Sequence, residues 1–519
     1  MQDTLMNKKE LNSVTNIMLQ ISNFRTIKAM KRKQLLTDVY IKPNIKDYSV
    51  VSFDRGDEII AEGEKSAMVQ FDTLQKIAAQ QAPFQKRKPV NPDKDIFAVY
   101  LNIKGHQRFT RAYIKGKLRL KTPSLVTLED LNSGLDNLYS TGNFERIRYK
   151  LKQKSLIDSE IEVKVEESPL KSFVRFALHY DDLYKSAALV NFTRKNLLFK
   201  SDVLSLDGIL GDKPRYNIDY YIDKGYYWSV GLNHRFYQYE QSLDFNFLNN
   251  RLSASELQDL TNVPINFVDI ETVDITTQLY LETILGQKFG FRIGLEHKFL
   301  KNSTETIGVD SNQVPGTVLD NVNYYSAYAA LKFDSFDDKY FPTRGVLFTG
   351  SFTGYPFSSI PSDQFEEFAV TKATLNYAVP ISKHFSGLAQ AASGIRLGKA
   401  TGVNSLDFFL GGFGAKPINN QVPFYGYDFL QLSGESYVKG LLQLDYNFWT
   451  KHHINIAANF ANVGNEIFNI REIYELKGFS GYALGYGYNS PIGPIQVKYA
   501  FSDDQKTTGK VLFSVGYWF

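Results

Sequence analysis

A chain of 519 residues is too long for one ordinary globular core, so we expect at least two domains. The 59 basic and 55 acidic residues leave a net charge of only +4, which argues against a nucleic-acid partner, and the absence of cysteine excludes disulfides and thiolate metal sites. The 32 Tyr and 39 Phe exceed what a soluble enzyme usually needs and are typical of the aromatic girdles of membrane barrels.

The N-terminal region does not have the pattern of a secretory signal. Residues 1–23 lack a basic segment followed by an apolar one, so they are not a secretory signal. If the chain is a barrel of the outer membrane, as its aromatic content suggests, it must first cross the inner membrane. We therefore expect this chain to be part of a longer precursor. No segment approaches about 18 uninterrupted apolar residues, so a membrane-spanning helix is not predicted, although alternating strands escape that test.

Residues 1–80 have a mixed α/β pattern. A helix is predicted over Met18–Leu36, a short strand over Asp38–Lys42 and a second helix over Asp57–Ala79. The apolar face of the second helix combines Ile60, Gly63, Ala67, Phe71, Leu74 and Ile77. Residues 81–94 are polar, contain three prolines and are typical of a linker.

Residues 95–168 have a compact β-α-α-β-β rhythm. The predicted elements are a strand over Phe97–Ile103, helices over Thr110–Leu118 and Thr127–Tyr139, and strands over Arg146–Leu151 and Glu160–Glu167. Thr110 is a plausible N-cap. Thr127 followed by Asp130 is a variant of the capping box, which places a helix start there.

Residues 169–519 alternate between apolar and polar side chains in one segment after another. In one of them Phe291, Ile293 and Leu295 point away from Arg292 and Glu296. About sixteen such segments predict a mainly β chain that ends in a sixteen-stranded antiparallel transmembrane barrel, with its charges facing the lumen. A soluble β-sandwich or propeller is the alternative, but it does not account for strands this long and this aromatic.

The connections between these segments differ in length. Short turns are predicted at Ile381–Lys383 and Lys451–His453, and long loops near 249–268, 301–320 and 399–433. The paired histidines His452 and His453 occupy the second turn. Adjacent side chains of an extended chain point to opposite faces, so shared metal binding is not expected.

Four motifs of the barrel region resemble one known family. They are Asp334–Gly345 (DSFDDKYFPTRG), Phe460–Asn465 (FANVGN), Ser490–Pro494 (SPIGP) and the terminal strand that places Val511, Phe513, Val515, Tyr517 and Phe519 on one face. They resemble motifs of the BamA/TamA-type superfamily of outer-membrane assembly factors and translocators, the bacterial surface antigen family. The resemblance implies that the terminal strand is an assembly signal read by the barrel-insertion machinery. Residues 95–168, with Thr141–Phe144 (TGNF), are similar to one polypeptide-transport-associated (POTRA) domain.

One departure from the family concerns its inward-folding loop. The loop motif V-R-G-F or V-R-G-Y corresponds here to Phe424, Tyr425, Gly426 and Tyr427. Tyr425 replaces the Arg, and Asn462 replaces the Asp of the F-x-D-x-G strand, which ends at Gly464. Both partners of the family's ion pair are therefore absent together, which avoids leaving one buried charge alone.

Residues 28–68 resemble the C-terminal end of a patatin-like phospholipase domain. The resemblance rests on Asp38–Pro43 (DVYIKP) followed by Phe53–Gly63 (FDRGDEIIAEG), and it makes residues 1–80 a patatin remnant. A patatin needs a nucleophilic Ser in G-x-S-x-G, which the sequence does not contain. We therefore predict no catalytic residue, no metal and no organic cofactor in this chain.

Three functional hypotheses follow. In the first, the barrel anchors a patatin-like module, in cis or in trans, and serves to export or present it. In the second, the chain is a stand-alone factor that assembles or translocates other polypeptides. In the third, it is a structural subunit of a larger outer-membrane complex. All three predict contact with outer-membrane lipid of a Gram-negative-type bacterium, a periplasmic N-terminal part unless it is exported, and no nucleic acid.

Overall fold

The structure is a computed structural model, and it forms two compact units, Met1–Pro92 and Asp93–Phe519. It describes residues 29–30, 32–45, 48, 55–81, 96–155, 158–181, 184–225, 228–244, 267–285, 288–304, 317–398, 406–413, 419–465, 478–490, 493–503 and 509–517. In this part of the chain, none of the helices has the length and apolar character needed to cross a membrane.

The described part of the first unit contains helices α2 (Gly56–Met68) and α3 (Phe71–Gln80). They replace the single helix predicted over Asp57–Ala79, because Gln70 leaves the helical backbone conformation with φ −100° and ψ 11°. Neither helix has a buried residue.

The strand predicted over Asp38–Lys42 is wrong, since these residues form no regular secondary structure. A strand needs a neighbouring strand for its backbone hydrogen bonds, and the described residues of this unit include none. Most of the helix predicted over Met18–Leu36 lies outside the described residues.

The second unit begins with a small α/β domain, residues 96–168. Its elements are β1 (Ile96–Lys104), α4 (Arg111–Leu118), β2 (Ser124–Val126), α5 (Leu128–Tyr139), β3 (Phe144–Gln153) and β4 (Ser159–Glu167). The sheet order is β2-β1-β4-β3, with β1 and β4 parallel. Both predicted helix starts are confirmed, because Thr110 accepts a hydrogen bond from the Tyr113 backbone and Thr127 forms a complete capping box with Asp130. The sequence pattern missed the three-residue strand β2.

The core of this domain lies between the helices and the sheet. Ile114 and Leu131 from the helices and Ile161 from β4 are fully buried. The charged side chains of the sheet form ion pairs on its outside, where Lys104 and Lys152 both contact Glu162 at 2.7 Å. The domain therefore has the ordinary arrangement of an apolar interior and a charged surface.

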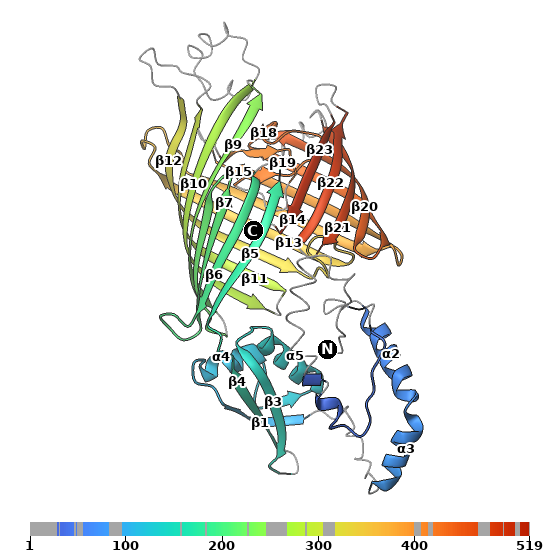
Figure 1. Ribbon diagram of the computed structural model, residues 1–519. Coiled ribbons are helices and arrows are strands. Elements are labelled where there is room, and N and C mark those ends of the chain that lie inside the picture. Colours follow the sequence, from blue (N-terminus) through green and yellow to red (C-terminus); the bar gives the residue numbers. More distant parts are fainter. Residues whose placement is uncertain are drawn as a thin grey trace. The chain divides into compact units, whose positions relative to one another are not determined.

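A closed barrel of sixteen strands forms the rest of this unit, and every neighbouring pair is antiparallel (Figure 1). This confirms the predicted fold class. The strands are β5 (Ser172–Asp181), β6 (Lys185–Lys195), β7 (Asp202–Gly211), β8 (Arg215–Ile222), β9 (Ser229–Asp244), β10 (Phe267–Leu285), β11 (Phe289–Thr304), β12 (Thr317–Asp334), β13 (Gly345–Ser358), β14 (Phe368–Pro380), β15 (Phe385–Leu397), β19 (Ser436–Trp449), β20 (His452–Gly464), β21 (Phe479–Ser490), β22 (Gly493–Ser502) and β23 (Lys510–Gly516).

Side chains alternate between the two faces of this wall. On β19, Leu442 and Leu444 are exposed on the outside, whereas Lys439 and Asp445 are buried on the inside. Apolar side chains thus face outward and charged ones face the lumen, which is the pattern expected of a barrel in lipid.

Three of the predicted connections between strands differ from those in the structure. His452 and His453 begin β20 and do not form a turn, because the register with β19 continues to them. The loop predicted near 301–320 is shorter, since β11 continues to Thr304 and β12 begins at Thr317. The loop predicted near 399–433 contains three short strands, β16 (Phe408–Leu410), β17 (Gln421–Val422) and β18 (Leu432–Gly434), which pair in the order β17-β16-β18. Most of the loop predicted near 249–268 lies outside the described residues.

Candidate functional site

The segment that connects β15 to β19 lies inside the barrel, and we call its described residues, 406–413 and 419–435, the inner loop. Phe408, Leu410 and Phe424 are at most 1% exposed. They pack in one cluster with wall residues such as Tyr324 and Tyr437. The apolar side chains of the inner loop thus form a second core, which fills part of the barrel.

The predicted loop motif occupies the centre of this packing. Phe424 and Tyr427 belong to the same buried cluster, with ring centroids 5.5 Å apart. Gly426 has φ +87°, and a Cβ at this position would lie 2.5 Å from the carbonyl oxygen of Phe501. The motif therefore needs glycine both for its backbone conformation and for its close approach to the wall.

Tyr425 connects the loop to two neighbouring parts of the wall. Its backbone N–H donates to Oδ1 of Asn459 on β20 at 2.8 Å. Its hydroxyl accepts a hydrogen bond from Nζ of Lys498 on β22, also at 2.8 Å. Asn459 is fully buried and Lys498 is 4% exposed, so both contacts are shielded from water.

The predicted partner strand, β20, does contact the loop, but through a different polar side chain. Asn459 accepts a hydrogen bond from the backbone N–H of Tyr425 and donates one to its carbonyl oxygen, whereas Asn462 lies three residues further along and pairs through its backbone with Val438. Gly464 lies against Gly434 at the end of the inner loop, where a Cβ on Gly434 would be 2.5 Å from the Gly464 nitrogen.

Two further lysines bind the inner loop. Nζ of Lys372 on β14 donates to the carbonyl oxygen of Asn419 at 3.1 Å and to Oδ1 of Asn420 at 3.2 Å. Nζ of Lys439 on β19 donates to the carbonyl oxygen of Pro423 at 2.6 Å. Together with Lys498, three lysines of the wall therefore each contact an uncharged oxygen of the loop.

The ends of the inner loop are held by a true ion-pair cluster. Arg396 on β15, whose side chain is 2% exposed, pairs with both Asp407 and Glu435. Arg396, the three lysines and Asn459 were not predicted from the sequence. The available signal was their place on the inward face of alternating strands, but that signal does not say which inward residues meet the loop.

The barrel closes between its last and first strands, β23 and β5, and we call this contact the seam. In the described residues the seam pairs only two positions, Val515 with Tyr180 and Gly516 with His179. On its other side β23 pairs six positions with β22. Within the described residues, the seam is thus paired at fewer positions than the neighbouring contact.

The residues of the predicted assembly signal lie at this seam. Val511, Phe513 and Tyr517 are exposed on the outside of the barrel, and Val515 takes part in the seam pairing. The Phe513 ring lies 5.7 Å from the Tyr180 ring across the seam. Phe519 lies outside the described residues.

The aspartates of the Asp334–Gly345 turn cap backbone groups. Asp337 accepts hydrogen bonds from the backbone of Thr343 at 2.9 Å and of Arg344 at 3.2 Å. Burial alone would raise the pKa of Asp337, but the hydrogen bonds from the Thr343 side chain and these backbone groups outweigh it and lower the pKa. Asp338 accepts in the same way from the backbone of Tyr340 and Phe341.

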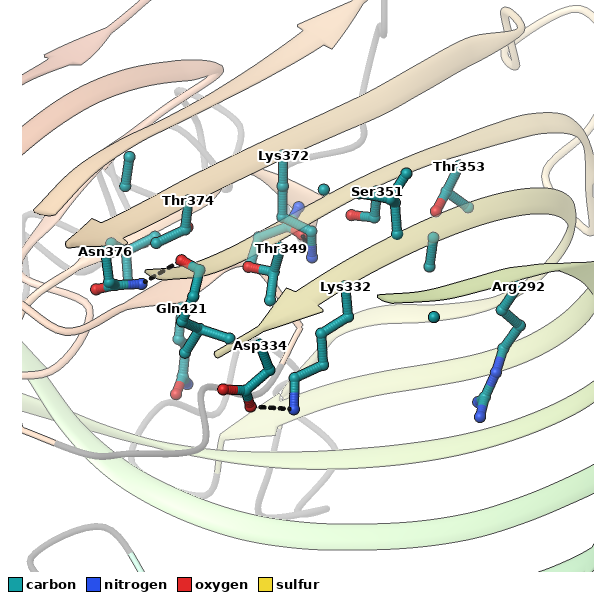
Figure 2. Close-up of a pocket in the computed structure, with 18 of the residues that line it drawn as sticks. Arg292, Lys332, Asp334, Thr349, Ser351, Thr353, Lys372, Thr374, Asn376 and Gln421 are labelled. Carbon is teal, nitrogen blue, oxygen red and sulfur yellow. Dashed lines mark hydrogen bonds and ion pairs between the residues drawn. The ribbon is translucent and has the colours of Figure 1, made fainter. Parts of the chain in front are cut away.

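A cavity of about 1310 Å³ lies between the inner loop and the wall. Its lining includes Asn420, Val422 and Tyr425 of the loop and reaches Lys288 and Phe336 at the end of the barrel where β5 begins. Figure 2 shows polar side chains of β13 and β14 on its wall. The lumen thus contains an open space between the inner loop and the end of the barrel where β5 begins, and we describe this side of the loop as below it.

A closed sixteen-stranded barrel with an apolar outside, a charged inside and an inner loop defines the class of outer-membrane β-barrels. A family model described as the OMP85 superfamily matches residues 159–519. Since this is more than half of the chain, the protein belongs to the OMP85 superfamily and is a barrel of the bacterial outer membrane. The resemblance of its motifs to the BamA/TamA-type superfamily is confirmed at this level.

Three solved structures are similar to this chain, and the first of them supports the fold. BamA from Haemophilus ducreyi lacking POTRA domains 1–3 has 13% sequence identity and a TM-score of 0.56, with 81% of this chain and 84% of that chain covered. CdiB from Acinetobacter baumannii has 14% identity and a TM-score of 0.49, covering 81% and 73%. CdiB from Escherichia coli has 11% identity and a TM-score of 0.42, covering 92% and 99%. No curated protein matches the chain significantly.

Proposed function

We propose that this barrel translocates polypeptides across the outer membrane or inserts them into it, and that the seam is where the wall opens. The observation that carries the proposal is the short seam. Among the described residues β5 pairs ten positions with β6 but only two with β23. Each backbone hydrogen bond contributes about 0.5–1.5 kcal/mol net, so among the strand pairs of the described residues the seam separates at the lowest cost.

An opened seam offers unpaired strand edges to a client. Unpaired backbone groups are costly in lipid, so an incoming strand that pairs with them is stabilised. The proposal agrees with the family resemblance of the sequence, which implies assembly or translocation of polypeptides. It requires no catalytic residue in this chain.

The small α/β domain is proposed to act as a periplasmic POTRA domain that receives the client. Its strand β3 is ten residues long and pairs with β4 at the edge of the sheet. An extended peptide can add to such an edge by backbone hydrogen bonds. This role places peptide capture before passage through the barrel.

The test compares a seam cross-link with a wall cross-link. Because the chain contains no cysteine, Val515→Cys with Tyr180→Cys can form a single disulfide across the seam, and Leu281→Cys with Ile293→Cys forms a matched one between β10 and β11. Cells depleted of the protein are expected to lose outer-membrane or secreted clients. The seam variant should restore them only in reductant, and the wall variant in both conditions. Full restoration by the oxidised seam variant contradicts the proposal.

A second candidate is the anchoring, export or presentation of a patatin-like phospholipase module. It is favoured by the resemblance of residues 28–68, which precede the segment matched by the family model. This function predicts esterase activity in native material that contains the chain, or in a tightly bound partner. Native material without esterase activity and without such a partner contradicts it.

A further inference from the structure

The cavity below the inner loop contains more positive than negative charge. Its lining includes seven cationic and three anionic side chains: Arg235, Lys288, Arg292, Lys298, Lys332, Lys372 and Lys439, against Glu282, Glu296 and Asp334. Three of the cations have an acidic partner. Arg292 pairs with Glu282, Lys332 with Asp334 and Lys298 with the buried Asp274.

Lys372 and Lys439 are different, because the described hydrogen bonds of their ammonium groups go to uncharged oxygens. Those oxygens belong to Asn419, Asn420 and Pro423 of the inner loop. The positive charges of Lys298 and Arg235 repel that of Lys372, and Glu296 is the acidic group that attracts it. Lys439 is only 5% exposed. Two cations thus line the cavity with incomplete charge compensation, so an anion that enters the cavity is attracted to them.

The wall around Lys372 carries groups that bind oxyanions. Figure 2 shows Lys372 and Thr374 on β14 and, on the neighbouring strand β13, Thr349, Ser351 and Thr353. Hydroxyl groups donate hydrogen bonds to carboxylates, and a carboxylate is a stronger partner for an ammonium group than an amide or carbonyl oxygen. A carboxylate in the cavity can therefore replace the loop oxygens at these lysines.

We propose that the cavity binds acidic segments of the transported polypeptide, and that Lys372 and Lys439 are the residues that bind their carboxylates. This inference rests on the proposed function and names the chemistry of its client. The cavity reaches the barrel end where β5 begins, so a client segment can enter it without first displacing the inner loop.

The test measures binding of two peptides to the full chain in non-ionic detergent by fluorescence anisotropy with an uncharged dye. One peptide is an alternating Glu-Ser octapeptide and the other the matched Lys-Ser octapeptide. We expect the acidic peptide to bind at least about tenfold more tightly and to lose affinity as sodium chloride is raised. Equal affinity for the two peptides overturns the proposal.

Variants locate the site. Lys372→Gln with Lys439→Gln should weaken binding of the acidic peptide about tenfold, because two charge-assisted contacts are lost. Lys332→Gln is the matched control, since Lys332 lies on the same lining but is paired with Asp334, and it should change affinity less than about twofold. A double variant that binds like the wild type overturns the proposal.

A third variant, which is expected to bind the acidic peptide more tightly, distinguishes the loss of a binding site from a displacement of the inner loop. Glu296 accepts hydrogen bonds from Gln278 and Ser326, and Glu296→Gln preserves the shape of the side chain while it removes a negative charge from the lining. It should tighten binding of the acidic peptide about two- to threefold. An unchanged affinity overturns the proposal even when the double lysine variant binds weakly, because that loss then reflects a moved loop.

The assay does not require transport. If the acidic peptide fails to bind while clients are still delivered in cells, only this inference is rejected. If binding follows the pattern above while depletion leaves all clients unchanged, the proposed function is rejected instead.

Discussion

The small α/β domain and the barrel place their charges on opposite sides. In the domain, Ile114 and Ile161 are fully buried, and the ion pairs of Glu162 lie on the outside of the sheet. In the barrel, Leu442 is 65% exposed on the outer face, whereas Asp274 and Lys298 form a buried pair inside. Strands of the same chain thus use the same two-residue alternation, and the surrounding solvent decides which face is apolar.

Because of this difference, the same substitution changes the free energy of unfolding by different amounts in the two regions. A new charge on the outside of the domain meets water, but a new charge on the outside of the barrel meets lipid. Inside the barrel, a lost hydrogen bond leaves a buried polar group without a partner. The predictions below follow this ranking.

The largest effect is expected for a charge on the outer face of the barrel. Leu442→Arg in the middle of β19 should destabilise the folded barrel by about 2–4 kcal/mol in lipid vesicles. Leu151→Arg on β3, where Leu151 is 42% exposed, is the control and should stay within about 0.5 kcal/mol. Denaturant unfolding measures both. Equal effects of the two substitutions would show that the outside of β19 does not face lipid.

An intermediate effect is expected at the contact between the inner loop and β20. Asn459→Ala leaves the Tyr425 backbone N–H without its acceptor and should cost about 1–3 kcal/mol, with the loop loosened. Asn462→Ala, at the position that the family motif indicated, should cost less than about 0.5 kcal/mol. Unfolding midpoints together with thiol labelling of Leu410→Cys, which is fully buried, measure both properties. A larger loss of stability for Asn462→Ala than for Asn459→Ala would show that Asn462 is the residue that holds the loop.

The smallest effect is expected on the surface of the small domain. Hydrogen bonds from Lys104 and Lys152 lower the pKa of Glu162 to about 2, from an ordinary value of 4.5. A carboxylate with a lowered pKa stabilises the folded state above its ordinary pKa, and that contribution disappears as the pH falls from 4.5 to about 2. Wild type should therefore melt slightly above Glu162→Gln at pH 7 and together with it near pH 2. A difference that persists at low pH would contradict the assignment.

Much of the fold could be predicted because alternation is a local property. In segments such as Phe291–Glu296, the alternation alone shows which face is apolar and which is polar, whatever strands lie beside them. The number of such segments then predicts the barrel. The capping box at Thr127 and the turn aspartates, such as Asp337, are equally local. The strand predicted over Asp38–Lys42 failed for the opposite reason, since a strand exists only with a partner.

The amino-acid sequence by itself determined the mainly β class, the number of strands, their apolar faces and the position of the loop motif at Phe424–Tyr427. The tertiary structure alone decided which wall residues hold that loop, because Lys372, Lys439, Asn459 and Lys498 come from four strands that meet the loop only when the barrel closes. It also decided the pairing of β23 with β5, which joins segments over three hundred residues apart in the chain. Contacts of this kind depend on closure of the whole sheet, and no local pattern encodes them.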